Sequence, residues 1–334
     1  MTNATLPDQP APVSTAGTRQ GETVARDRLV LSARRTASDG VVEFEFARPD
    51  GSRLPDWAPG AHIDVVLPDG VVRQYSLCGD RRDAFRYRIA VQREPLGRGG
   101  SVALHDRLDV GDIVAFGGPR NNFRLAPALR YLFVAAGIGI TPLLPMIQQA
   151  VHLNVDWELL YLGRNRRRLA FLDELATHGE RVAVHCADEL GRAELAAWKP
   201  VDPRTRVYAC GPERLLDAIQ EWGAHPGGFA PKVERFATVD QSDAPSTQFE
   251  VKAARSGIST LVGTEETIVA ALRRAGVDVL TSCAQGVCGT CETDVLAGRP
   301  DHRDSLLDDA ERRTSNCMFP CVSRSRDSLL VLDL

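Results

Sequence analysis

The stretch "SCAQGVCGTCETD" (residues 282–294) places three cysteines and two glycines within thirteen residues. Cys283, Cys288 and Cys291 are spaced C-x4-C-x2-C, and Cys321 follows after 29 intervening residues. Plant-type 2Fe-2S proteins use this spacing, whereas structural zinc sites usually pair their ligands in two short C-x2-4-C units. The second short unit is missing here. The stretch therefore predicts a C-terminal iron-sulfur domain, with a zinc site and inert thiols as the alternatives.

Small residues fill the loop between these cysteines. Ala284, Gly286 and Gly289 let backbone N–H groups approach the sulfurs, where they can stabilise the negative charge of a cluster. Cys317 competes with Cys321 for the role of fourth ligand, because it lies only four residues earlier. A packed thiol is the other interpretation of Cys317, and the spacing alone leaves the choice open.

Composition sets the broad class of the protein. The 334 residues suffice for two or three domains, each with its own core. With 43% apolar residues, 25% charged residues and a formal net charge of -4, the chain is an ordinary globular protein without a general attraction to nucleic acid. The longest apolar run, "YLFVAAGIGI" (131–140), is about half as long as a membrane span. We therefore expect no membrane segment.

The N-terminus and the isolated cysteines bear on the compartment. Residues 1–26 lack the basic start and apolar block of a secretory signal, and we expect a flexible polar tail there. This predicts a cytoplasmic protein, in which metal or redox roles of cysteine outrank disulfides. Cys78, Cys186 and Cys210 stand alone, and each is expected to be a small buried hydrophobic residue.

Three patterns divide the rest of the chain. Residues 27–126 alternate with period two, as in "VVEFEF", with Asp-Gly turns, and predict a small antiparallel barrel or sandwich. Residues 127–237 alternate short apolar strands with helices, which predicts a parallel α/β sheet that binds ligands at the C-terminal ends of its strands. The polar residues 238–247 predict a linker, and 248–334 a third domain.

The third domain is expected to contain one clear helix. The segment "EETIVAALRRAG" (265–276) follows Thr264, a residue type that caps helix N-termini, and ends at Gly276. We therefore expect Thr264 as the N-cap and Gly276 as the stop signal.

Two motifs in the first domain suit a flavin. In "RQYSL" (73–77) the tyrosine can pack on the ring system, the serine hydroxyl can hydrogen-bond, and the arginine offers a fork to phosphate. In "GRGGS" (97–101) consecutive glycines free backbone N–H groups for a phosphate, and the helix expected after Ser101 presents its N-terminus. The alternative for the first motif is a strand with an ordinary surface arginine.

Two further motifs lie in the second domain. In "AAGIGITPLL" (135–144) the glycines allow a tight strand-to-helix bend and the close approach of a pyrophosphate. "ACGPERLL" (209–216) stands at the end of a later strand. Neither motif is specific alone, and for Cys210 a buried thiol before a turn is the alternative.

The chain from about residue 27 to 334 resembles the phthalate dioxygenase reductase and vanillate demethylase reductase family. "SCAQGVCGTCETDVLAGRPDHRD" and "CVSRS" are similar to its C-terminal ferredoxin domain, and "RQYS", "GRGGS" and "CGP" occur in the family order. The resemblance implies a flavin barrel, a ferredoxin reductase-like nucleotide domain and a β-grasp ferredoxin domain. It also selects Cys321 as the fourth ligand beside Cys283, Cys288 and Cys291.

The resemblance further implies which residues hold the other cofactors. FMN rather than FAD is implied, with Arg73, Gln74, Tyr75, Ser76, Gln92, Gly99, Gly100 and Ser101 around it. The nicotinamide nucleotide is implied at Gly137, Gly139, Thr141, Pro142, Cys210, Gly211 and Pro212. Thr141, Cys210 and Phe236 would surround the hydride transfer, although Phe236 could equally be a core residue at a domain edge.

The choice between NADH and NADPH depends on the loop after the second strand of this domain. "LGRNRRRLAF" carries Arg164, Arg166, Arg167 and Arg168, which could bind a 2'-phosphate. However, arginine outnumbers lysine 37 to 3 in the chain, so a solvated basic loop is equally reasonable. The related reductases mostly use NADH, and NADH is the expected donor, with NADPH as the alternative.

The expected activity follows from the resemblance. We expect a monomeric electron-transfer reductase that delivers electrons to a Rieske-type aromatic oxygenase or O-demethylase. A cytochrome P450 partner, a flavin-inactive ferredoxin-like carrier and a zinc-containing interaction module are the alternatives. The acidic segment 301–311 could dock on a basic partner or simply be solvated.

Overall fold

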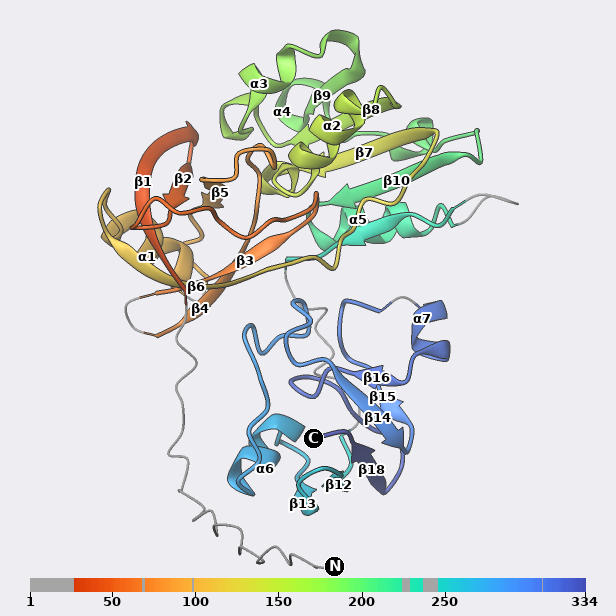
Figure 1. Cartoon of the computed structure of the whole chain (residues 1–334). Coiled ribbons are helices and arrows are strands. Elements are labelled where there is room, and N and C mark those ends of the chain that lie inside the picture. Colours follow the sequence, from red (N-terminus) through yellow and green to blue (C-terminus); the bar gives the residue numbers. More distant parts are fainter. Residues whose placement is uncertain (1–26, 68–69, 98, 224–228, 237–245, 308) are drawn as a thin grey trace, which may run out of the picture.

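The computed structural model describes residues 27–67, 70–97, 99–223, 229–236, 246–307 and 309–334. The expected tail (1–26) and nearly all of the expected linker (238–247) lie outside these residues. Three main sheets follow one another along the chain, and a separate two-stranded sheet lies in the last part (Figure 1). The arrangement confirms the predicted fold class of an antiparallel flavin-type barrel, a parallel α/β part and a C-terminal ferredoxin-like part.

The first sheet is antiparallel throughout and has one helix beside it. Its elements are β1 (Asp27–Ser38), β2 (Val41–Ala47), β3 (His62–Val66), β4 (Val72–Ser76), β5 (Tyr87–Gln92), α1 (Gly100–Arg107) and β6 (Ile113–Arg120). The strand order is β4-β3-β6-β1-β2-β5. A two-residue turn at Asp39-Gly40 joins β1 to β2, with Gly40 in the left-handed region (φ 79°) that such turns require. In β2, Phe44 and Phe46 point into the core, as the period-two pattern predicts.

The second sheet is parallel and carries helices on both faces. Its elements are β7 (Arg130–Ala136), α2 (Leu143–His152), β8 (Asp156–Gly163), α3 (Leu172–Ala176), β9 (Val182–Cys186), α4 (Ala187–Leu190), β10 (Thr205–Cys210), α5 (Glu213–Gln220) and β11 (Lys232–Glu234), with 3-10 turns η1 (Gly137–Ile140), η2 (Arg166–Arg168), η3 (Gly179–Arg181) and η4 (Leu195–Trp198). The strand order is β11-β10-β7-β8-β9. The order reverses beside β7, and the expected ligand site at the C-terminal strand ends lies there.

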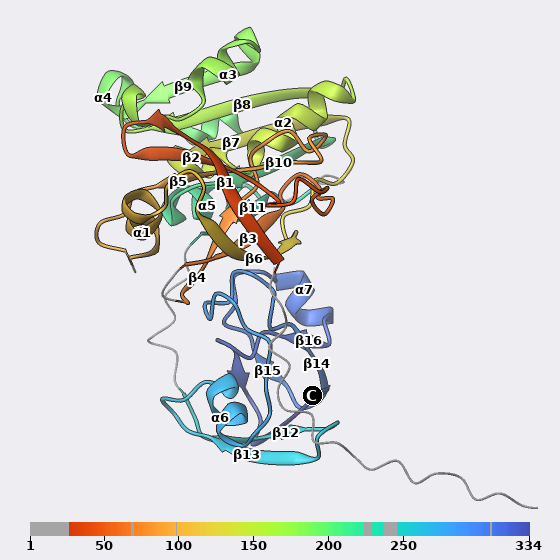
Figure 2. The same ribbon diagram turned by 60° about the vertical axis from the view of Figure 1, so that its left-hand side comes forward.

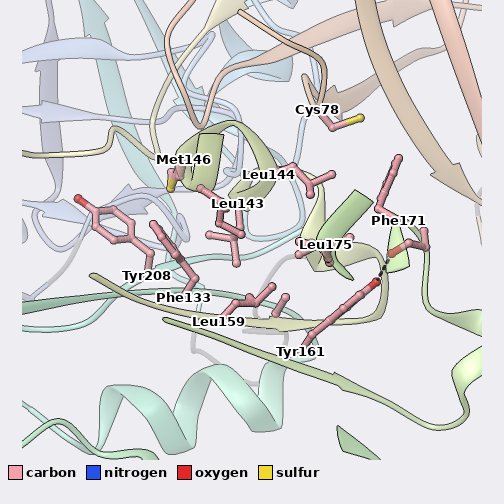
Figure 3. Close-up of a cluster of buried hydrophobic side chains, with 14 of the residues drawn as sticks. Cys78, Phe133, Leu143, Leu144, Met146, Leu159, Tyr161, Phe171, Leu175 and Tyr208 are labelled. Carbon is pink, nitrogen blue, oxygen red and sulfur yellow. Dashed lines mark hydrogen bonds between the residues drawn. The ribbon is translucent and has the colours of Figure 1, made fainter. Parts of the chain in front are cut away.

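One apolar core joins the first two parts. Cys78 of the barrel lies in the same cluster as Met146 of α2 and Phe133 of β7 (Figure 3). Arg88 of β5 adds an ion pair to Glu174 of α3, with Nη2 to Oε2 at 3.1 Å. Because the shared cluster of side chains is buried and apolar, the barrel and the parallel sheet form a single packed unit.

The third part has its own core and a mixed sheet. Its elements are β12 (Phe249–Ala253), β13 (Ile258–Val262), α6 (Ile268–Arg274), β14 (Thr293–Ala297), β15 (Pro300–Asp301), α7 (Asp309–Thr314), β16 (Cys317–Met318), β17 (Arg324–Ser325) and β18 (Leu329–Leu332). The main sheet has the order β13-β12-β18-β14-β16, and β15 pairs with β17 separately. Figures 1 and 2 both place this part next to β4 and β6 of the barrel.

The helix of the third part begins later than expected. Thr267, not Thr264, is its N-cap, and the Thr267 side chain accepts a hydrogen bond from the N–H of Ala270. The helix starts there because the buried apolar residues begin at Ile268. Gly276 follows the helix end with φ 87°, as expected of a stop signal.

None of the helices in the described parts of the chain is long and apolar enough to cross a membrane.

Candidate iron-sulfur, flavin and nucleotide sites

The four cysteines predicted as ligands converge in the third part. The four thiols lie close enough to shift one another's pKa: the contacts among them lower the pKa of Cys283 and Cys291 and raise the pKa of Cys288 and Cys321. Four cysteine sulfurs packed together in this way are the donor set of a metal site. Four sulfurs gathered from one loop and a distant strand connection fit a 2Fe-2S cluster.

Backbone amides point at these sulfurs. The N–H of Gln285 donates to Cys283 Sγ at 3.3 Å, and the N–H of Thr290 donates to Cys288 Sγ at 3.4 Å. Ala284, the residue after Cys283, has φ 52°, a left-handed conformation that few non-glycine residues adopt. The loop therefore curls around the sulfurs and offers N–H groups to a negatively charged cluster.

Cys317 lies outside this group of thiols. It begins β16, and its Sγ lies 2.9 Å from the Ser315 hydroxyl oxygen. The contacts of Cys317 fit a packed thiol and leave Cys321 as the fourth member of the group.

The structure brings the two flavin motifs together. A Cβ atom added at Gly100 would lie 2.5 Å from both Cγ and Nε of Arg73, so only glycine lets the arginine cross the start of α1. The Ser101 hydroxyl accepts a hydrogen bond from the N–H of Glu94 at 3.0 Å, which ties the start of α1 to the segment that follows β5. The N-terminus of α1 and an arginine thus share one place at the barrel edge, which suits a phosphate.

The remaining flavin candidates lie along β4 and β5. Burial raises the pKa of Tyr75, which keeps its hydroxyl neutral. Ser76 is buried at the end of β4. Gln92 lies between the barrel and the parallel sheet, with its Oε1 4.0 Å from the position of a Cβ at Gly137. The Gln74 amide instead donates to Asp64 Oδ1 at 3.0 Å and to the Ser282 hydroxyl at 3.4 Å.

A pocket of about 730 Å³ opens at the C-terminal ends of β7, β8, β9 and β10. Of the predicted cofactor residues, it is lined by Gln92, Gly137, Gly139, Gly211, Pro212 and Phe236. Phe236 is 45% exposed, so it is not a core residue. Three other candidates do not line the pocket: Thr141 is 2% exposed and its hydroxyl donates to the Ile138 carbonyl, Pro142 is buried at the start of α2, and Cys210 is fully buried.

Close packing explains why a glycine occupies position 139 in the strand-to-helix bend. A Cβ at Gly139 would lie 2.2 Å from the carbonyl oxygen of Cys210. The bend after β7 therefore touches the end of β10 directly, and any side chain at Gly139 would push the two apart. This contact brings both nucleotide motifs to one wall of the pocket.

Arginines dominate the charge of the pocket. Arg164 and Arg168 of the expected basic loop line it, whereas Arg166 and Arg167 do not. Sequence reasoning missed three more lining arginines, Arg192, Arg214 and Arg235, and the histidine His185. These residues come from separate segments that only the folded sheet brings together, so no sequence motif predicts their place in the pocket.

Two barrel residues that sequence reasoning missed face the cysteine loop. Asn122 donates its side-chain N–H to the carbonyl oxygen of Cys288 at 2.8 Å. His62 is paired with Ser76 in the ladder of β3 and β4 and lies within the electrostatic reach of Cys283. Burial lowers the pKa of His62 to about 4, so its ring is neutral. The candidate flavin and cluster sites therefore adjoin each other across this contact.

For the acidic segment 301–311 the sequence left a docking face and a solvated face open, and neither Asp301 nor Asp304 is a free surface acid. The Asp301 carboxylate accepts a hydrogen bond from Arg303 Nε at 2.8 Å. Asp304 is buried, and its Oδ2 accepts a hydrogen bond from the N–H of Leu307 at 2.9 Å. Both carboxylates are therefore used within the third part. Residue 308 and the side chain of Asp309 lie outside what the structure describes.

Comparisons with known proteins agree with this arrangement. Residues 251–326 match the family of the 2Fe-2S iron-sulfur cluster binding domain. The chain is 42% identical to the phenoxybenzoate dioxygenase subunit beta of Ectopseudomonas oleovorans, with 93% of this chain and 98% of that protein covered.

Two solved structures resemble the whole chain. Phthalate dioxygenase reductase, described as a modular structure for electron transfer from pyridine nucleotides to 2Fe-2S, is 35% identical with a TM-score of 0.68, covering 93% of this chain and 98% of that one. An intact type IV self-sufficient cytochrome P450 monooxygenase is 39% identical with a TM-score of 0.87 over 95% of this chain, which spans only 43% of that chain.

The barrel, the parallel sheet and the 2Fe-2S domain define an electron-transfer oxidoreductase. Similarity over almost the full length then assigns it more narrowly: the chain belongs to the phthalate dioxygenase reductase family, as its motifs predict.

Proposed function

We propose that this protein is the reductase component of an oxygenase system. It takes electrons from NADH through FMN and a 2Fe-2S cluster and delivers them to a terminal Rieske-type aromatic oxygenase or O-demethylase. The observation that carries the proposal is the contact of Asn122 with the Cys288 carbonyl, because it holds the cysteine loop against the barrel that carries the flavin motifs. Full-length similarity to oxygenase subunits and reductases supports it.

Cys283, Cys288, Cys291 and Cys321 are the proposed cluster ligands. Their thiols converge, and amides of the same loop donate to two of the sulfurs. Cluster potentials depend on such hydrogen bonds, so the loop holds the cluster and also tunes it.

Flavin binding is proposed at the barrel edge. Arg73 and the N-terminus of α1 would hold the phosphate, and Gly99, Gly100 and Ser101 shape that end. Tyr75 and Ser76 of β4 would face the ring system, with Gln74 and Gln92 at its borders. The short spacing between the motifs is why FMN is proposed rather than FAD.

The large pocket is the proposed nucleotide site. Gly137, Gly139, Gly211 and Pro212 form its wall beside the barrel, and Phe236 lines it from the end of β11. Thr141, Pro142 and Cys210 act from behind this wall by holding the bend in place. NADH is the proposed donor, and the arginines of the pocket favour NADPH as a second donor.

When bound, the flavin would supply two-electron hydride chemistry and the cluster would supply one-electron transfer. The residues of this chain position the partners and exclude water. Gln92 and Phe236 would close the ends of the nucleotide site. Hydride transfer between a stacked nicotinamide and flavin ring requires no general acid or base. The proposed domain boundaries, near residues 126 and 237–248, separate the proposed flavin, nucleotide and cluster sites from one another.

The proposed setting is the cytoplasm, because all eight cysteines are free. We propose a monomer that meets its acceptor transiently. A cytochrome P450 is the second candidate acceptor, since the chain resembles part of a self-sufficient P450. A flavin-inactive carrier would require loss of "GRGGS" or "CGP", and both are present.

Reconstitution tests this function. Purified protein, NADH and candidate terminal oxygenases should give NADH-dependent substrate oxidation with a Rieske-type oxygenase. Arg73→Ala should release the flavin on gel filtration, because the phosphate loses a charge-assisted contact. Oxidation supported only by a P450 would select the second candidate, and a variant that keeps its flavin would remove Arg73 from the site.

A further inference from the structure

A second pocket lies in the ferredoxin-like part, apart from the sites described above. It has a volume of about 460 Å³ and lies between the β15–β17 ribbon, the turn before β15, and α7. Its lining residues are Gly298, Arg299, Pro300, His302, Arg312, Arg313, Ser315 and Arg326. Four arginines and a histidine line it, and none of the carboxylates that the structure describes does.

Some of this positive charge is already neutralised. Arg299 pairs with Asp327 at 2.7 Å, and Arg326 lies 3.7 Å from Asp301. Arg312 and Arg313 form no ion pair with the residues that the structure describes. Arg312 Nη2 donates to the carbonyl oxygen of Asp304 at 2.6 Å, whereas Arg313 has no counter-charge among the described residues.

Buried polar atoms of the pocket also lack partners within the described chain. Both ring nitrogens of His302 and the Nε of Arg312 are inaccessible to solvent and have no hydrogen-bond partner there. The His302 side chain is only 6% exposed, and its Nδ1 lies 3.6 Å from Asp304 Oδ1. Buried polar atoms without a partner are rare in native proteins, and a bound ion nearby is one explanation for them.

The pocket adjoins the cysteine loop. The N–H of Ser305 donates to the carbonyl oxygen of Gly286 at 2.9 Å, and a Cβ at Gly286 would lie 3.0 Å from Asp304 Cα. The segment that carries His302 thus packs directly on the loop between Cys283 and Cys288. A protein that receives electrons from this loop must dock close to the pocket.

We propose that this pocket binds a carboxylate side chain of the electron-accepting protein when that protein docks on the ferredoxin-like part. Arginine is suited to this contact because its planar fork holds both oxygens of a carboxylate. The sign of the contact is opposite to that of an acidic docking face, which was one of the two interpretations of segment 301–311. The proposal rests on the proposed function, since it requires an acceptor protein.

The first experiment measures whether the pocket binds a carboxylate-like oxyanion. The full-length protein with its cofactors and saturating NAD⁺ is titrated with acetate and with inorganic phosphate at constant ionic strength, and thermal unfolding is followed. Both anions should raise the Tm of the wild type with saturation. Arg313→Gln should weaken binding about tenfold, because a charged hydrogen bond is lost. Arg255→Gln, an exposed arginine of the same part outside the pocket, is the matched control.

The second experiment measures docking. Reduction of the acceptor protein found by reconstitution is followed against its concentration. Arg313→Gln should raise the KM for the acceptor about tenfold, while NADH bleaches the flavin and cluster bands at the wild-type rate. Arg255→Gln should leave both unchanged.

The outcomes separate the two proposals. Oxyanion binding that is equal in wild type and Arg313→Gln overturns the pocket as a binding site. Loss of oxyanion binding with an unchanged acceptor KM overturns the docking role and leaves a site for free anions. A wild type that reduces no acceptor contradicts the proposed function, and the anion titration still decides whether the pocket binds oxyanions.

Discussion

The side-chain amide of Asn122 donates to the carbonyl oxygen of Cys288 at 2.8 Å, across 166 positions of sequence. Asn122 follows the last barrel strand, and Cys288 is a proposed cluster ligand. The apolar core of the third part contains no barrel residue among those described, whereas the barrel and the parallel sheet share one core. Polar contacts such as this one therefore hold the cluster loop against the flavin barrel.

Replacing Asn122 should slow electron transfer between the two parts. Asn122→Asp keeps the size of the side chain but loses the donor, and a single hydrogen bond contributes about 0.5–1.5 kcal/mol. We expect the cluster to be bleached by NADH several-fold more slowly while the flavin is bleached at the wild-type rate. Stopped-flow absorption resolves the two bands. Equal rates of cluster bleaching in variant and wild type would contradict the role of this contact.

The choice of fourth ligand predicts opposite results for two cysteines. Cys321→Ser should lose the cluster, because its sulfur joins those of Cys283 and Cys291. Cys317→Ser should retain it, because Cys317 contacts Ser315 instead. Iron and acid-labile sulfide are measured after anaerobic purification. Cluster loss in Cys317→Ser with retention in Cys321→Ser would reverse the assignment.

The close contact at Gly139 predicts a coupled loss of stability and nucleotide binding. Gly139→Ala places a Cβ 2.2 Å from the Cys210 carbonyl oxygen, and such overpacking costs about 1–3 kcal/mol. We expect a lower Tm and a higher KM for NADH. Gly263→Ala is the control, since its Cβ would meet no atom closer than 3.8 Å. Normal NADH binding by Gly139→Ala would show that the bend tolerates displacement.

A buried carboxyl predicts a pH dependence of stability. Glu234 pairs with Cys210 in the sheet, its Oε2 has no partner among described atoms, and burial raises its pKa to about 8. The unfolded chain releases this proton at about pH 4.3. Between these two pKa values the folded state binds more protons, so the free energy of unfolding falls as pH rises, by up to about 1.4 kcal/mol per pH unit.

The Glu234→Gln variant tests this dependence. Its Tm should fall less than that of the wild type between about pH 5 and about pH 8, because glutamine does not ionise. Thermal unfolding of both proteins across this range provides the comparison. Parallel curves for the two proteins would exclude Glu234 as the source.

The sequence was most informative where chemistry fixes spacing. The C-x4-C-x2-C pattern predicts the iron-sulfur domain, and the alternation in residues 41–47 predicts the strand that buries Phe44 and Phe46, because both follow from local geometry. Contacts between distant segments leave no such pattern. Asn122 is one of two adjacent asparagines, and nothing local distinguishes the one that binds Cys288.

Charge was the property that the sequence predicted least well. Asp301 and Asp304 are the first two acids of a polar segment, yet Asp301 pairs with Arg303 and Asp304 is buried. Arg313 of α7 follows in the same part of the chain and forms no ion pair with the residues that the structure describes. The surface charge of this part depends on which side chains come into contact between β15, β17 and α7. Amino-acid composition does not determine these contacts.

Anaerobic titration of the purified protein with NADH, followed by visible absorption together with iron and sulfide analysis, shows whether electrons pass from the nucleotide through a flavin to a 2Fe-2S cluster. We expect about two irons and two acid-labile sulfides per chain, one flavin, and bleaching of both the flavin and the cluster bands. A colourless protein without sulfide, or a coloured one whose bands NADH leaves unchanged, would contradict this expectation.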